Sequence, residues 1–181
     1  MKDYKNIADE ELFEYFQISD DKVAFQVLYD RYSKRVFAYC LRTFGNKEIA
    51  KDIFQKIMYN IIAKRDNFKG GNFLAWLMII TRNECLMEKR SAKNKEEVTD
   101  NTLTSDSFTS TDFYLNEHIH SAVSNLHEDY REIVELRYFD DFSYEEIAKM
   151  LNISLSLVKV RLFRAKKQLS LILSPYKELI K

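Results

Sequence analysis

The first 90 residues place apolar side chains at steps of three and four, which is the period of amphipathic α-helices. The pattern predicts four helices, over residues 10–17, 23–43, 48–64 and 73–90. Asp9 is the expected N-cap of the first helix, and Gly45 is expected to end the second in a left-handed conformation. The third helix has four isoleucines in one row at four-residue spacing, from Ile49 to Ile61.

Residues 91–112 interrupt this periodicity, because only four of the 22 are apolar. A segment of that composition buries too little surface to offset the entropy of ordering it. We therefore expect an all-α protein of two small helical domains joined by a flexible polar linker. The four-helix domain spans residues 1–92, the linker residues 93–116, and the second domain residues 117–181.

The second domain contains a helix-turn-helix pattern. Ser143 and Glu146 fit a capping box, the helix that they begin stops at Asn152, and Ser154 is placed to cap a longer helix that reaches about Leu173. On a helical projection, one side of this longer helix is an apolar stripe around Val158, and the other side is cationic. A helix of this kind is typical of DNA recognition in the major groove. The residues predicted to contact DNA are Ser154, Ser156, Lys159, Val160, Arg161, Phe163, Arg164 and Lys167.

The first domain has a second candidate DNA-binding region between its third and fourth helices. Aromatic residues alternate with cations and an amide there, a combination that suits single-stranded or flipped bases. The residues are Phe68, Lys69, Asn72 and Trp76, with Arg82, Asn83, Lys89 and Arg90 on the helix beyond. The helical spacing of Phe73 and Trp76 fits simple core packing as well.

Charge is segregated along the chain, although the 28 basic and 28 acidic residues cancel. Residues 31–92 contain 13 basic and 5 acidic residues, and residues 147–181 contain 8 basic residues and 1 acidic residue. Residues 1–30 and 117–146 are acidic. Two separate basic blocks suggest a polyanion contacted at two places, and clustered solvated helix faces are the alternative.

Composition excludes several other classes of protein. Three Gly and one Pro disfavour turn-rich β-folds, and two Cys exclude a disulfide-stapled scaffold. No apolar run reaches the roughly 18 residues of a membrane span, so we expect a cytoplasmic protein without membrane insertion. His118 and His120 have no further ligand at suitable spacing, so no metal or cofactor is expected. An enzyme built on this histidine pair, a helical hydrolase, is an alternative with almost no support.

Two sets of motifs together resemble a known family. The first set runs Ala24-Phe25-x-x-Leu28-Tyr29-x-x-Tyr32, Ala50-x-Asp52-Ile53-x-Gln55, Phe68 to Trp76 and Thr81-Arg82-Asn83, and is similar to region 2 of bacterial sigma factors. The second runs Tyr130-Arg131-Glu132 through Leu136-Arg137-Tyr138-Phe139, Ser143 to Ala148 and Val158-Lys159-x-Arg161-Leu162-x-Arg164-Ala165, and is similar to region 4. With these two regions only, the chain resembles an extracytoplasmic-function (ECF) sigma factor of RNA polymerase.

The resemblance implies a non-enzymatic subunit that directs core RNA polymerase to promoters. Region 2 would melt the −10 element and region 4 would recognise the −35 element. It also implies partners: the β′ coiled coil and β flap of the core enzyme, promoter DNA and an anti-sigma factor. Docking on the core enzyme is expected at Asp52, Gln55, Lys56 and Tyr59. An autonomous helix-turn-helix regulator that needs no polymerase is the alternative.

Several residues depart from the pattern of the family: Met58 stands where a Phe is usual, Met87 where an Asp is frequent, and Leu157 and Val160 where small polar residues are common. Three further residues depart from it as well. Lys56 replaces a usual acid, His127 replaces a usual proline before region 4, and Asn152 replaces the glycine of the turn. Asn is the residue next best able to adopt the left-handed backbone.

Overall fold

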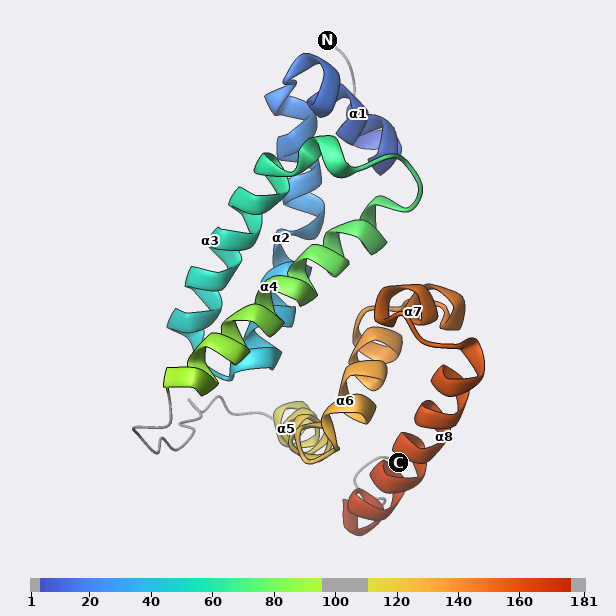
Figure 1. Ribbon diagram of the computed structural model, residues 1–181. Helices are drawn as coiled ribbons and strands as arrows, with labels where there is room; N and C mark the ends of the chain where they lie inside the picture. The colour runs from blue at the N-terminus through green and yellow to red at the C-terminus, as the bar shows by residue number, and fades with distance from the viewer. Residues whose placement is uncertain (1–3, 96–110, 177–181) are drawn as a thin grey trace. The chain divides into compact units, whose positions relative to one another are not determined.

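The computed structural model describes residues 4–95 and 111–176, and every regular element in these ranges is helical (Figure 1). The chain divides into two compact units, Met1–Ser105 and Asp106–Lys181. We refer to them as unit 1 and unit 2. No helix within the described ranges combines the length and the apolar character needed to cross a membrane.

Unit 1 contains the four helices that the periodicity predicts. They are α1 (Asp9–Ser19), α2 (Lys22–Phe44), α3 (Lys47–Ala63) and α4 (Phe73–Lys95). A short 3-10 turn (Arg65–Asn67) follows α3 and leads into the loop before α4. α4 extends past Arg90 into the expected linker, and α5 begins inside the linker at Thr111; residues 96–110 lie outside the described residues.

Local caps explain where α2 begins and ends and where α3 begins. Asp21 accepts hydrogen bonds from Val23 N and Ala24 N and so caps α2. Asn46 caps α3 in the same way, and Gly45 ends α2 with the predicted left-handed φ of +63°.

The prediction for Asp9 is wrong. α1 begins at Asp9 itself, its N-cap Ala8 makes no side-chain cap, and the Asp9 carboxylate binds Arg31 and Tyr32 of α2 instead. Burial and the hydrogen bond to Asp9 raise the pKa of Tyr32. A cap is a local interaction, and here a charged partner from the neighbouring helix competes for the same carboxylate.

The core of unit 1 is formed by the inner faces of its helices and by an aromatic cluster. Phe13 of α1 lies 5.4 Å from Phe68, 4.8 Å from Phe73 and 5.1 Å from Trp76 between ring centroids. In the isoleucine row of α3 the last three side chains are buried, but Ile49 is 44% exposed. Each four-residue step turns about 40° around the helix, so a row of this spacing leaves the core face at one end.

Unit 2 consists of α5 (Thr111–Ser124), α6 (Glu128–Val134), a π-helical segment (Glu135–Phe139), α7 (Tyr144–Leu151) and α8 (Leu155–Ile172). Its core is made by apolar side chains of these helices, including Ile133, Leu136, Ile147, Val158 and Leu162. His127, at the position of the usual proline, is the N-cap of α6, and its Nδ1 accepts from Asp129 N at 3.4 Å.

Candidate nucleic-acid interface

The helix-turn-helix of unit 2 is built from local caps, as predicted. Ser143 Oγ accepts from Glu146 N at 3.2 Å, and Glu146 Oε2 accepts from Ser143 N at 2.8 Å, which completes the capping box. Asn152 ends α7 in the left-handed conformation with φ +53°. Ser154 Oγ then accepts from Leu157 N at 3.2 Å and begins α8. These caps set the turn between α7 and α8, and with it the direction in which α8 presents its outer face.

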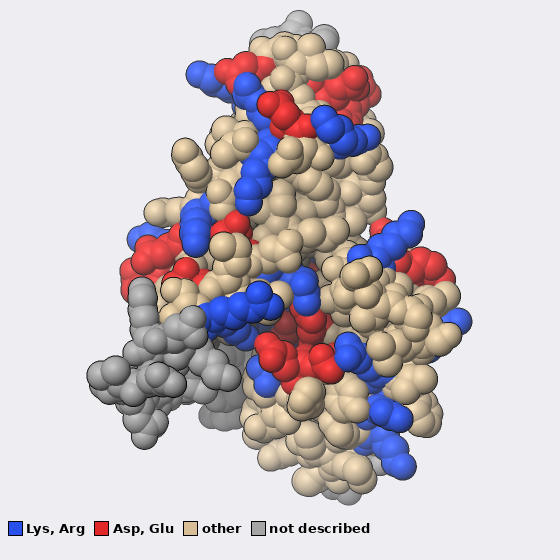
Figure 2. All heavy atoms as spheres, in the orientation of Figure 1, with Lys and Arg blue, Asp and Glu red and all other residues tan. Residues whose placement is uncertain are grey.

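The outer face of α8 is exposed and cationic. Val158, Leu162 and Ala165 are buried against the unit, whereas Ser156, Lys159, Val160, Phe163, Arg164 and Lys167 are exposed. Lys and Arg side chains line the edge of the second unit that α8 forms (Figure 2). Arg161 differs from the other predicted contacts, because its Nη2 donates to Asp129 Oδ2 at 2.7 Å. Its guanidinium is therefore engaged inside unit 2.

In unit 1 the residues predicted to bind single-stranded DNA fall into two groups, one exposed and one buried or partly buried. Lys69, Asn72, Asn83 and Arg90 are exposed, and Arg82 and Lys89 are partly exposed. Seven residues bring a helix back to within about 20° of the same direction, so Asn83 and Arg90 lie on one strip of α4. Phe68 is buried and Trp76 is partly buried, with their ring centroids 5.3 Å apart. Both rings therefore pack in the aromatic cluster.

The loop before α4 has an unusual backbone and an acidic neighbour. Gly70 and Gly71 both have φ of +90°, a conformation that L-residues rarely adopt. Asn72 Oδ1 accepts from Ala75 N at 2.9 Å and caps α4. A hollow of about 480 Å³ lies between this loop and α1. It is lined by Ala8, Glu10, Glu11, Glu14, Gln17, Phe68, Lys69 and Gly70.

The residues expected to dock on the core enzyme share one face of α3. Asp52, Gln55, Lys56 and Tyr59 are all exposed, and Tyr59 is 72% exposed. Asp52 also borders a groove of about 390 Å³ between the end of α2, the start of α3 and the C-terminal part of α4. Lys56 points to another role, because its Nζ lies 3.7 Å from Glu84 Oε2 and 3.6 Å from Glu88 Oε2 of α4.

Sequence reasoning missed three residues that shape this region. Glu84 is buried on α4 and is bound by Lys56 of α3 and by Lys64, the residue that follows α3. Glu10 and Gln17 of α1 bond to the backbone on either side of the loop before α4. An acid inside the apolar pattern of a helix is a weak signal of a buried ion pair, but no local signal connects α1 with a loop about 50 residues away.

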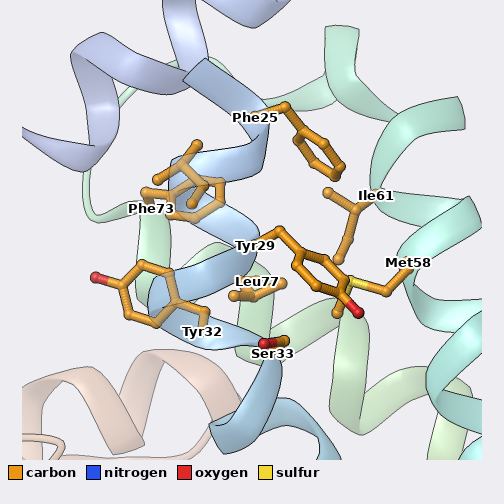
Figure 3. A pocket seen from close by; sticks show the side chains of 9 residues that line it. Phe25, Tyr29, Tyr32, Ser33, Met58, Ile61, Phe73 and Leu77 are labelled. Carbon is orange, nitrogen blue, oxygen red and sulfur yellow. The ribbon is translucent and has the colours of Figure 1, made fainter. Parts of the chain in front are cut away.

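The described residues contain little else that resembles a chemical site. An apolar hollow of about 20 Å³ lies among α2, α3 and α4, where Tyr29, Met58 and Leu77 face one another (Figure 3). Its volume is far below the several hundred Å³ of a typical ligand pocket. Cys40 Sγ and Cys85 Sγ are 4.0 Å apart and buried; this contact and burial raise the pKa of the Cys85 thiol. No group of three or more His, Cys, Asp and Glu in the described ranges suits a metal ion.

Unit 2 has a capped helix-turn-helix with a cationic outer helix, and unit 1 has exposed cations on α4 and on the loop before it. Together these features define an all-α DNA-binding protein. A family model of sigma-70 region 2 matches residues 28–95, and a model of sigma-70 region 4 matches residues 117–169. The chain is 32% identical over 146 residues to the ECF RNA polymerase sigma factor EcfG of Rhodopseudomonas palustris. The aligned part covers 78% of this chain and 79% of that relative. The chain belongs to the ECF family of sigma factors, and such a protein directs RNA polymerase to promoters.

Other known proteins agree with this assignment. The ECF sigma factor SigW of Bacillus subtilis is 28% identical over 167 residues, with 82% of this chain and 88% of that relative covered. Among solved structures, the sigma factor RpoE of Bartonella quintana, crystallised with the anti-sigma factor NepR, is similar with a TM-score of 0.69 at 25% identity. That match covers 83% of this chain and 96% of the other.

Proposed function

We propose that the two units bind different promoter elements while the chain is held on core RNA polymerase. The observation that carries this proposal is that each unit has its own exposed basic surface, one on α8 and one along α4 and the loop before it. Two weak DNA contacts on one chain act together through effective concentration when both units are also bound to the polymerase. The acidic residues 1–30 and 117–146 discourage DNA binding by the free protein.

The −10 element is assigned to unit 1. Extruding a base costs a few kcal/mol, which polar contacts and stacking must offset. Lys69 and Arg90 suit the phosphates, and the side-chain amide of Asn83 suits a base edge, because all three are exposed on the loop or along α4. The buried ring of Phe68 and the half-buried ring of Trp76 support this surface from beneath.

The −35 element is assigned to α8. Arg164 is suited to a guanine, because a guanidinium bonds O6 and N7 together, whereas Lys159 and Lys167 suit phosphates. Val160 is 42% exposed and Phe163 is 71% exposed, so both can meet thymine methyl groups. Arg161 is assigned to the stability of unit 2, because it is paired with Asp129.

Docking on the core enzyme is assigned to the α3 face, with the β′ coiled coil as its partner, and the β flap is assigned to unit 2 by family resemblance. Asp52, Gln55 and Tyr59 support this, since they share an exposed face beside the groove that Asp52 borders. Promoter recognition takes place in the cytoplasm, where polymerase and chromosome are found, and the polymerase catalyses RNA synthesis.

An anti-sigma factor is the expected regulator. The solved relative from Bartonella quintana is bound to one, and an exposed apolar side chain such as Phe163 suits a protein partner in the DNA-free state. In a titration with such a partner, Phe163→Ser should weaken capture of the free chain.

The decisive experiment is in vitro transcription with core enzyme on a library of genomic fragments. Start sites that share two sequence elements at a constant spacing are expected, and co-purification with core enzyme should accompany them. Asn83→Ala should then impair transcription from duplex promoters more than from templates already mismatched at −10, with exposed Gln26→Ala as the matched control. Site-specific DNA binding by the free chain, without transcription, would overturn the proposal.

A further inference from the structure

The loop between α3 and α4 lies beside α1 (Figure 1). Side chains of α1 bond to its backbone on both sides. Gln17 Nε2 donates to Arg65 O at 2.6 Å and to Phe68 O at 3.1 Å. An amide nitrogen has two hydrogens, so one side chain satisfies two carbonyl groups on the incoming side of the loop. Gln17 is partly buried, which limits competition from water.

The outgoing side of the loop is held by Glu10. Its Oε1 accepts from the backbone N–H of Phe73, the first residue of α4, at 2.9 Å. The first N–H groups of a helix have no partner inside the helix, and the positive end of the helix dipole favours a carboxylate there. Glu10 therefore acts as a cap supplied by another helix, next to the cap that Asn72 supplies.

Between these two attachments the loop has little packing of its own. Residues 69–72 are all exposed, and a Cβ added to Gly70 or Gly71 would meet nothing within 4 Å. Two consecutive glycines also give the chain its greatest backbone freedom. The position of Lys69 and Asn72 consequently depends on where α1 holds the ends of the loop. Arg65 also forms an ion pair, at 2.5 Å, with Asp20, the residue that follows α1, but this pair is largely exposed and contributes little.

We propose that Gln17 and Glu10 are positioning residues that set how sharply the loop before α4 discriminates bases of the −10 element. The inference rests on the proposed function, which assigns that loop to the −10 strand. Neither side chain needs to touch the DNA. Each fixes backbone atoms of the loop, and a loop that samples several positions contacts every base with similar, weaker affinity.

The test measures binding of fluorescent single-stranded −10 oligonucleotides to the holoenzyme. The oligonucleotides have the −10 sequence found in the transcription library, or that sequence with one base changed. For Gln17→Met and Glu10→Ala we expect the ratio of the two affinities to fall about fivefold or more, the effect of losing a hydrogen bond of ordinary strength. Affinity for core enzyme should stay unchanged. Glu10→Gln, which keeps an acceptor oxygen, should restore most of the ratio.

The controls separate positioning from charge and from folding. Glu14→Ala removes one negative charge from the same hollow, and it should leave the ratio unchanged. Gly71→Ala strains the loop from within, because φ is +90° there, and it should reproduce the loss without any change in α1. An unchanged ratio in the α1 variants, with or without an equal loss of affinity on both oligonucleotides, would overturn this inference and leave the −10 assignment standing. A wild-type holoenzyme without base preference would overturn the −10 assignment itself.

Discussion

Reversing the charge of Lys56 tests the ion pairs that join α3 to α4. Its ammonium group lies within 3.7 Å of carboxylate oxygens of Glu84 and Glu88, and the Glu84 side chain is only 5% exposed. Lys56→Glu would place a third carboxylate beside the other two. It would also introduce the acid that is usual in the family at this position, in a chain whose α4 is arranged for a cation.

The magnitude follows from distance and exposure. Two unit charges 4 Å apart interact with about 1 kcal/mol in water and about 4 kcal/mol near a protein surface. The Lys56 side chain is 47% exposed, so the lower value applies to each interaction. Losing two attractions and gaining two repulsions should lower the free energy of unfolding of unit 1 by about 2–4 kcal/mol. The loss should shrink in high salt, because the exposed part of the network is screened.

The assay is urea unfolding of the full chain followed by tryptophan fluorescence. Trp76 is the single tryptophan and lies in the aromatic cluster of unit 1, so its signal reports that unit. A loss of this size should move the urea midpoint down by about 1–2 M. Lys51→Glu, an exposed reversal on the same helix, is the control, and Lys56→Glu with Glu88→Lys should recover part of the loss. Equal midpoints for Lys56→Glu and Lys51→Glu would refute the reasoning.

Three further predictions concern docking, recognition and the turn. Asp52→Lys should weaken binding to core enzyme about tenfold in a pull-down titration with an unchanged Trp76 unfolding midpoint, since exposed changes rarely alter stability by more than about 0.5 kcal/mol. On a panel of −35 variants, Arg164→Ala should reduce the preference for one base by about 1–3 kcal/mol. Lys159→Ala should weaken binding to all sequences and reduce the slope of log affinity against log salt concentration by about one. Uniform losses for both variants would make Arg164 a phosphate contact. Ser143→Ala should lower the stability of unit 2 by about 1 kcal/mol in thermal unfolding followed by circular dichroism, and no shift would mean that the capping box is dispensable.

Much of the fold could be predicted from the sequence, because the determining interactions lie within a few residues of one another. The apolar period specifies α1 to α4, and the capping box at Ser143 with the left-handed Asn152 specifies the helix-turn-helix. The outer face of α8 follows from the same period, since one buried stripe leaves the opposite face to solvent. The motifs that identify the family occur in these locally determined segments.

Only the tertiary structure decided which polar side chains are engaged within the protein. Asp9 binds α2 instead of capping α1, Lys56 pairs with acids of α4, Arg161 pairs with Asp129, and Gln17 holds a loop 48 and 51 residues away. In sequence such residues look like ordinary surface charges or caps. Their partners lie on other helices, and the choice between water, a local backbone group and a distant side chain depends on how those helices pack. That packing is a property of the whole unit, and a local pattern of residues does not contain it.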